Sequence, residues 1–321
     1  MIQLFKKIVL YGLLILLALE LLVRIFHLHN ERPLRYADTK NVEKWVPNQT
    51  NFAITGNRKQ NIGRYYINNF GFNSVHENYI PNENSKEIAL VGDSFIEGFH
   101  EDYTNSLGQQ IEKNIKGLKV LEFGYAGYDL ADELHLVKAY GELFNNIDHT
   151  FIYLRYEDDI DRNSYELSSR LSLDTPLNRL IKKIKLLVYL KDIGAFNSIK
   201  QIPSRFKSII SRRIEPQKEK LSTELHNKAM LADSIKLENF KMLLNTYPID
   251  KNKYTFLLDK SKCSTSFLAY LDSNGYSTLD LNKALGNSEH PTTLIYDQHW
   301  SKHGRSLVAK LLIDYIKTEV N

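Results

Sequence analysis

Three side chains in this sequence of 321 residues have the types and spacing for nucleophilic catalysis. Ser94 comes two residues after Gly92, which ends the apolar run 88–91. A serine hydroxyl is a weak nucleophile at neutral pH unless a base accepts its proton, and a histidine base works best when a carboxylate holds its ring. Asp297 and His299 can supply both groups, because residues two apart in an extended segment project to the same side.

Alternating strands and helices are predicted to position these groups. Short apolar runs indicate strands at 87–91, 119–123, 149–154, 253–258 and 276–281. Helical spacing indicates helices at 105–116, 130–144 and 264–273, and a last helix after Ser301 as N-cap. Strands separated by helices of this length favour a parallel sheet covered on both faces. Ser94, Gly127 and the acidic loop 157–159 fall at the carboxyl ends of strands, where such sheets carry their active sites.

Two separate blocks resemble those of the SGNH (GDSL-type) hydrolases. They are Gly92-Asp93-Ser94 and the stretch 297–304, which reads Asp-Gln-His-Trp-Ser-Lys-His-Gly. The resemblance covers roughly 64–316 apart from a basic insertion, and the Asp-x-His-Trp form resembles the branch that includes polysaccharide O-acetyltransferases and acetyl esterases. It implies a three-layer α/β/α sandwich with a parallel sheet of about five strands. It also implies that Ser94 is the nucleophile, His299 the general base and Asp297 the residue that orients the base.

The same resemblance implies an oxyanion hole with one departure from the family pattern. The donors would be the Ser94 amide, the Gly127 amide (with Gly124 as the alternative) and an asparagine side chain after the third strand. Here Asp158 stands where the family has that asparagine, and Asp159 follows it. An ionised aspartate donates no hydrogen bond and repels a developing oxyanion. Either Asp158 is protonated, or another donor substitutes for it, or the enzyme is slow or inactive.

Other residues near these blocks have alternative interpretations. Trp300 could bind substrate by stacking on a sugar ring, or simply pack the loop. His100 could line the mouth of the site and contact substrate, or lie on the surface. His299 and His303 are four residues apart, but no third ligand accompanies them, so we predict neither a metal site nor a cofactor.

The beginning of the chain is predicted to anchor it in a membrane. The stretch 8–25 is almost wholly apolar and, at about 1.5 Å per residue, just spans a bilayer core. No convincing small-x-small cleavage site follows it, so an uncleaved anchor over 1–29 is favoured over a signal peptide. We expect a linker over 30–50 and an SGNH hydrolase-like domain over 51–321, with a helical insertion at about 163–247.

Charges around the span suggest its orientation and one local contact. Lys6 and Lys7 precede the apolar run, which favours a cytoplasmic amino terminus and a main domain outside the cytoplasm, in the periplasm or at the cell surface. Glu20 and Arg24 are four residues apart near the end of the span and are expected to form an ion pair at the membrane interface.

The net charge of +4 is unevenly distributed. The stretch 178–220 holds twelve Lys or Arg and three Asp or Glu, a charge of +9, so the rest of the chain is close to −5. Within it, 180–190 has apolar residues at helical spacing with lysines between them. Such a helix can lie on an anionic membrane surface, bind an anionic polymer or form a solvated lobe. No signature of nucleic-acid recognition accompanies the basic residues, so we expect no nucleic-acid partner.

The sequence therefore predicts a single-pass, membrane-anchored serine esterase or O-acyltransferase. Its expected substrate is an ester, most simply an acetyl group on an extracytoplasmic glycan, which would pass through an acyl-serine intermediate. A membrane-embedded acyl-transfer partner is left open. The alternatives are a lipid esterase and a binding or assembly protein that has lost turnover through Asp158.

Overall fold

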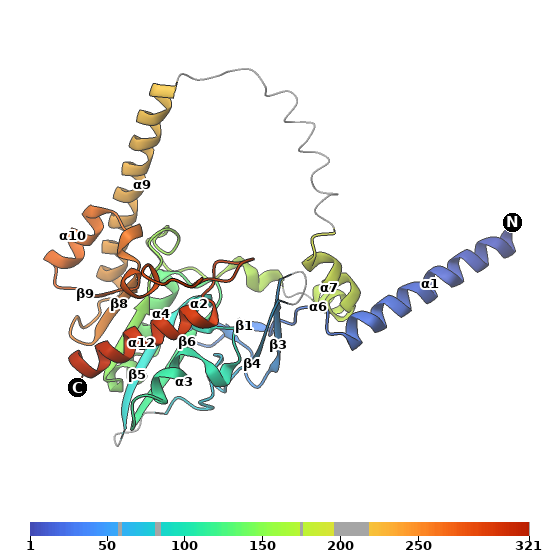
Figure 1. Ribbon diagram of the computed structural model, residues 1–321, viewed down its shortest axis with the longest axis horizontal. Helices are drawn as coiled ribbons and strands as arrows, with labels where there is room; N and C mark the ends of the chain where they lie inside the picture. Colours follow the sequence, from blue (N-terminus) through green and yellow to red (C-terminus); the bar gives the residue numbers. More distant parts are fainter. Residues whose placement is uncertain (57–59, 81–84, 174–175, 196–217, 321) are drawn as a thin grey trace.

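The computed structural model describes residues 1–56, 60–80, 85–173, 176–195 and 218–320 (Figure 1). At its centre is a five-stranded sheet in the order β6-β5-β7-β8-β9, and every neighbouring pair of strands is parallel. The strands are β5 (Lys86–Gly92), β6 (Leu118–Gly124), β7 (His149–Tyr153), β8 (Tyr254–Leu258) and β9 (Ser277–Asp280). They match the predicted strands to within one residue at each end, so the predicted parallel sheet is confirmed.

Helices cover both faces of this sheet and complete the three-layer architecture expected from the sequence. Ile88 and Leu90 of β5 pack into the cluster on one face, whereas Ala89 and Val91 pack into the cluster on the other. The first face is covered by α3 (Leu107–Glu112) and α12 (Lys302–Glu319), and the second by α4 (Leu130–Ala139), α9 (Lys218–Thr246) and α10 (Thr265–Ser273). Strands buried on both faces are apolar throughout, which explains the continuous apolar run before Ser94.

Two predicted helices are shorter than expected. The prediction at 105–116 corresponds to α3, which begins after Ser106, whose hydroxyl accepts a hydrogen bond from the amide of Gln109. The prediction at 130–144 corresponds to α4 and a separate helix, α5 (Gly141–Asn146), because the backbone leaves the helical conformation at Tyr140. Further short elements in the domain include α11 (Asn282–Leu285) and the 3-10 turns η1 (Tyr103–Asn105), η2 (Ser169–Leu173) and η3 (Lys260–Lys262).

The expected linker at 30–50 is instead a packed part of the domain. It contains the antiparallel pair β1 (Arg35–Ala37) and β2 (Glu43–Trp45), and a second pair follows, β3 (Thr50–Thr55) and β4 (Asn61–Tyr66). Trp45 is 1% exposed, because its ring lies between those of Phe99 and Tyr125 at centroid distances of 5.9 and 4.6 Å. Burial of this indole, which contacts residues distant in the sequence, is the physical reason that the linker prediction is wrong.

The first helix, α1 (Ile2–Ile25), extends away from the body of the domain (Figure 1). It is long and apolar enough to cross a membrane, and nearly all of its side chains are exposed. Near its end, Arg24 donates a hydrogen bond to Glu20 at 2.7 Å, which confirms the expected pair.

The helical insertion begins after β7. Its described helices are α6 (Pro176–Lys183), α7 (Lys185–Asp192) and α9, and the predicted helix at 180–190 is interrupted at Ile184. Much of the basic stretch 178–220 lies outside the described residues.

Candidate active site

The sheet edge at the end of β5 presents the predicted nucleophile. Asp93 caps the short helix α2 (Ser94–Glu97): its carboxylate accepts a hydrogen bond of 2.8 Å from the amide of Phe95. The helix ends after one turn at Gly98, whose φ of 68° is easily adopted only by glycine. Strand, cap and single turn thus hold Ser94 at the carboxyl edge of the sheet, and Asp93 has the turn-stabilising role.

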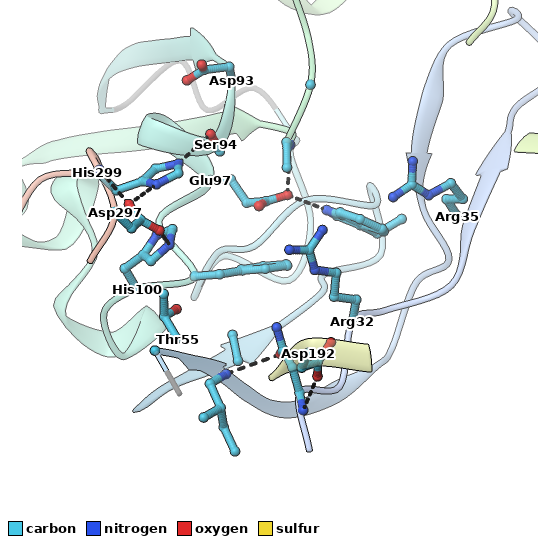
Figure 2. A pocket seen from close by; sticks show the side chains of 18 of the residues that line it. Arg32, Arg35, Thr55, Asp93, Ser94, Glu97, His100, Asp192, Asp297 and His299 are labelled. Atoms are coloured by element: carbon cyan, nitrogen blue, oxygen red, sulfur yellow. Dashed lines mark hydrogen bonds and ion pairs between the residues drawn. The ribbon is translucent and has the colours of Figure 1, made fainter. Parts of the chain in front are cut away.

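Ser94, His299 and Asp297 meet in one hydrogen-bonded chain (Figure 2). His299 Nε2 lies 2.7 Å from Ser94 Oγ, and His299 Nδ1 lies 2.5 Å from Asp297 Oδ1. Burial opposes ionisation of Asp297, but hydrogen bonds from the amide and ring of His299 outweigh it and lower the pKa of this carboxyl. The geometry is therefore that of a nucleophile, a base and an anion that orients the base.

The loop before α12 brings the histidine to the serine from the far end of the sequence. Ser301 caps α12 by accepting a hydrogen bond from the amide of Gly304 at 3.1 Å. A Cβ on Gly304 would lie 2.1 Å from the carbonyl oxygen of Thr292, so only glycine lets the helix approach this loop. The ring of His299 also stacks on Phe95, with centroids 4.7 Å apart.

His100 is a second histidine on the same carboxylate. Its Nε2 lies 3.2 Å from Asp297 Oδ2, and its ring stacks on His299 with centroids 4.0 Å apart. Burial and the neighbouring His299 lower the pKa of His100 to about 4, so the ring is neutral at physiological pH. His100 lines the cavity, as predicted, but its contact with Asp297 was not evident from the sequence.

Two backbone amides next to Ser94 remain available to an oxyanion. Within the part of the chain that the structure describes, neither the Ser94 amide nor the Gly127 amide donates a hydrogen bond. Gly127 lines the same cavity as Ser94. Gly124 serves a different purpose, because a Cβ there would lie 2.0 Å from the backbone nitrogen of Glu97. Of the two candidate glycines, the structure therefore favours Gly127.

Asp158 lies differently from what the family pattern implies. Its side chain is 64% exposed, lies 3.4 Å from Arg155 Nη1, and is not among the side chains that line the cavity. Asp159 is buried instead, and it accepts a hydrogen bond of 2.7 Å from the amide of Arg155. Burial and the nearby Asp93 raise the pKa of Asp159 to about 8. The carboxylate expected to face the oxyanion is thus largely exposed to solvent and paired with Arg155.

Arg155 brings a positive charge close to Ser94, the predicted nucleophile. Its Nε lies 3.1 Å from Asp93 Oδ2, too poorly aligned for a hydrogen bond, and its guanidinium carbon lies 5.6 Å from the ring centroid of Phe95. Asp93 and Phe95 flank Ser94 in the sequence, and Arg155 lines the cavity with it. Nothing in the sequence pattern indicated a role for this residue, although it lies only three positions before Asp158.

Two other residues that the sequence singled out, Trp300 and His303, do not line the cavity. Trp300 is 4% exposed, lies outside the cavity lining and packs edge-on against Phe95 and Tyr153, which favours the packing interpretation over stacking on a sugar. His303 points elsewhere, with Nε2 2.9 Å from Ser288 Oγ.

One group of side chains has the spacing of metal ligands. Among the described residues, His100, Asp297 and His299 offer ligand atoms within 4.8 Å of one another. His299 Nδ1 already contacts Asp297 and His299 Nε2 already contacts Ser94, so hydrogen bonds among the side chains are sufficient to explain why these ligand atoms lie close together.

A cavity of about 700 Å³ opens above the triad. Arg32 and Asp192 lie across it from His299 (Figure 2). Arg32 makes no hydrogen bond or ion pair with any described residue, so its charge is available to a ligand. The volume exceeds what an acetyl group needs, and so leaves room for a larger alcohol or acyl portion of an ester.

Glu97 links the cavity to the packed amino-terminal strands. Its Oε1 accepts hydrogen bonds from Trp45 Nε1 at 2.7 Å and from the amide of Ala126 at 3.0 Å, next to Gly127. Burial raises the pKa of Glu97 from 4.5 to about 7.

This raised pKa predicts a pH-dependent stability. Between pH 4.5 and 7 the unfolded chain loses the Glu97 proton while the folded chain keeps it, so the free energy of unfolding falls as pH rises through this window. Glu97→Gln removes that contribution. As pH rises from 4.5 to 7.5, the free energy of unfolding of the variant should increase by about 3 kcal/mol relative to that of wild type. Chemical denaturation of both proteins in detergent at a series of pH values measures this difference. A difference between the two proteins that does not change with pH would contradict the prediction.

Comparisons with known proteins find similarity of fold only. No family model matches the chain, and no curated protein is similar enough in sequence to count as a relative. Solved structures that resemble it include a member of the lipolytic G-D-S-L family from Veillonella parvula (10% identity, TM-score 0.37, 73% of this chain and 100% of that one). Another is a lipase/acylhydrolase from Enterococcus faecalis (13% identity, TM-score 0.40, 72% of this chain and 95% of that one). A third is a lipase from a goat rumen metagenome (11% identity, TM-score 0.39, 74% of this chain and 100% of that one). At these values a likeness establishes neither family nor chemistry, so function has to be argued from the residues of the site.

Proposed function

We propose that this protein is an SGNH-type serine hydrolase or acyltransferase, anchored in a membrane by α1, that acts on an ester outside the cytoplasm. The observation that carries the proposal is the chain from Ser94 Oγ through His299 to Asp297, with distances of 2.7 and 2.5 Å. These three groups come from opposite ends of the domain, and their alignment at the carboxyl edge of a parallel sheet suits acyl transfer.

The reaction follows from this geometry. His299 accepts the Ser94 proton as Oγ attacks the ester carbonyl, and the carbonyl oxygen becomes an oxyanion. The imidazolium, held by Asp297, then gives the proton to the leaving alkoxide, and the C–O bond of the ester breaks to leave an acyl-serine. Water or a sugar hydroxyl attacks this acyl group, again with His299 as base, and regenerates Ser94. Water as acceptor gives an esterase, and a hydroxyl acceptor gives a transferase.

Arg155 is our candidate for the third oxyanion donor, in place of the side chain at position 158. None of its guanidinium N–H groups is used in a well-aligned hydrogen bond within the described chain, although three carboxylates hold the group in place. With the Ser94 and Gly127 amides it would supply donors from three separate loops. With Arg155 as donor, an oxyanion hole can form although position 158 holds an aspartate. This favours an enzyme over a binding protein without turnover.

Replacing Arg155 tests this role. We expect Arg155→Met to lower kcat/KM for an activated acetate ester by about a hundred- to a thousandfold, the usual effect of losing one oxyanion donor. Asp158→Asn should change it by less than about threefold, because the carboxylate points away from the cavity. Arg64→Met, which removes an ion-paired arginine outside the cavity lining, is the matched control. A large gain in Asp158→Asn would instead show that Asp158 blocks the site.

The acyl group and its carrier are part of the proposal. An acetyl group on an extracytoplasmic glycan is our first candidate, and a lipid ester is the second because Leu28, just after α1, lines the cavity. Release of acetate from acetylated xylan, compared with release of long acyl chains from nitrophenyl esters, separates the two. An added sugar acceptor that diverts the acyl group from water would identify a transferase, and no turnover of any ester would contradict the proposed function.

A further inference from the structure

The first two helices of the insertion are attached to the end of α1 (Figure 1). Glu20 in the last turns of α1 accepts hydrogen bonds from the amides of Lys185 and Leu186 at 3.0 and 2.7 Å, where α7 begins. Arg24 donates to the carbonyl oxygen of Lys183 at 2.6 Å, where α6 ends. An acidic residue inside an apolar span is therefore used to hold α6 and α7 at the point where α1 leaves its apolar run.

A second set of contacts fixes α7 to the segment that follows α1. Lys185 Nζ lies 2.5 Å from Glu31 Oε1, and the amide of Asn30 donates to Asp192 Oδ2 at 3.3 Å. Both ends of α7 are thus held by chain that lies within seven residues of the end of α1. The position of α6 and α7 relative to α1 is set by hydrogen bonds and ion pairs.

These two helices nevertheless expose apolar side chains. Four of them are between 37% and 59% exposed: Leu180, Ile181, Ile184 and Leu187. Basic residues accompany them, since α6 and α7 together, 176–192, contain five Lys or Arg and a single acidic residue, Asp192 at the far end of α7. Exposed aliphatic residues with only positive charge between them suit the boundary between lipid tails and anionic headgroups.

We propose that α6 and α7 lie on an anionic lipid surface, with these four aliphatic side chains in the boundary region of the bilayer. The continuity with α1 selects this occupant, because the same bilayer that receives α1 necessarily passes close to the residues that its last turn holds. If α6 and α7 faced solvent, the four aliphatic side chains would stay exposed to water. An anionic polymer could pair with the lysines, but it would also leave these four side chains exposed.

The contact has a consequence for the active site, which rests on the proposed function. Tyr189 and Ile193 line the same cavity as Ser94 and His299, and so does Leu28. The cavity is therefore bounded on one side by the triad and on the other by chain at the lipid surface. Esters presented at that surface, by a lipid or by a glycan attached to one, reach Ser94 without leaving the membrane boundary.

Depth-dependent quenching tests the lipid contact. The single cysteine is first removed by Cys263→Ser, and a bimane fluorophore is attached to Ile184→Cys in the full chain. The protein is placed in nanodiscs of phosphatidylcholine and phosphatidylglycerol with brominated acyl chains. Lys310→Cys, an exposed position on α12, is the matched control. We expect strong quenching at position 184 and little at position 310.

The outcomes separate this proposal from the proposed function, because the readout does not depend on turnover. Equal, weak quenching at both positions would overturn the lipid contact and identify α6 and α7 as a solvated lobe, whether or not the protein hydrolyses esters. Lys182→Glu with Lys183→Glu in the labelled chain should reduce the quenching at position 184, and high salt should do the same in the labelled chain without these two changes. If neither change alters the quenching at position 184, anionic lipid does not contribute to the contact.

Discussion

Ser94→Ala is expected to lower kcat for nitrophenyl acetate by about a millionfold, and His299→Ala by a similar factor. The reason is that Ser94 Oγ and His299 Nε2, 2.7 Å apart, act as one unit: the hydroxyl is inert without the base, and the base has nothing to activate without the hydroxyl. The double variant should therefore be about as slow as either single variant. Rates are measured on purified full chain in detergent.

The combination of variants makes this prediction specific. If the effects of Ser94→Ala and His299→Ala multiplied, the two residues would act independently, and their hydrogen bond would not be part of catalysis. A loss below about tenfold in Ser94→Ala would exclude Ser94 as the nucleophile, because background reaction through bound water does not approach the rate of an acyl-serine pathway.

Asp297→Asn is expected to lower kcat at neutral pH by about ten-thousandfold. The amide can present its NH₂ group to His299 Nδ1, which favours the ring tautomer with its proton on Nε2, so the base no longer accepts the Ser94 proton. The amide also cannot stabilise the imidazolium that forms. Activity should recover partly at high pH, where hydroxide replaces the base, so the pH dependence of kcat is the measurement.

His100 provides the comparison for this variant. His100→Gln keeps a donor near Asp297 Oδ2 but loses the stacking on His299, and His100→Phe keeps the stacking but loses the donor. The hydrogen bond is to a charged group, so we expect the phenylalanine variant to lose roughly ten- to a hundredfold in kcat and the glutamine variant less. An effect of His100→Phe as large as that of Asp297→Asn would mean that His100 itself takes part in proton transfer.

The sequence predicts the sheet well because the signals for it are local. Five short runs mark the five strands of the sheet, of which all but the edge strand β9 are buried, and Gly92 with Asp93 marks the turn that presents Ser94. The triad partners were identified by order and spacing, since two residues that share one loop can meet with no further folding information. The roles of these residues remain predictions, whereas their proximity is now a property of the structure.

The features that the sequence does not reveal depend on distant partners. The sequence around Trp45 is that of a polar linker, but in the structure Trp45 packs against Phe99 and Tyr125, which are distant in the sequence. His100 contacts Asp297 across almost two hundred positions of sequence, and no local pattern encodes that contact. At the break between α6 and α7, the amides that begin α7 donate hydrogen bonds to Glu20, which lies about 165 positions earlier in the sequence.

Asp158 illustrates a different limit. The family pattern predicts which residue type belongs at that position, and the sequence shows that it is absent, but neither says where the substituted side chain points. In the structure the Asp158 side chain is 64% exposed and lies 3.4 Å from Arg155, which places a positive charge of its own beside Asp93 and the cavity that Ser94 lines. A substitution that suggests an inactive protein is thereby compatible with an active one.

The central claim, an activated Ser94, is tested most directly by labelling the purified full chain with a fluorophosphonate probe. We predict that wild type is labelled, that Ser94→Ala is not, and that Asp158→Asn is labelled at about the wild-type rate. Labelling gained only in Asp158→Asn would mean that the native site is disabled and that the protein binds its ligand without turnover. An absence of labelling in all three proteins would contradict the assignment of Ser94 as an activated nucleophile.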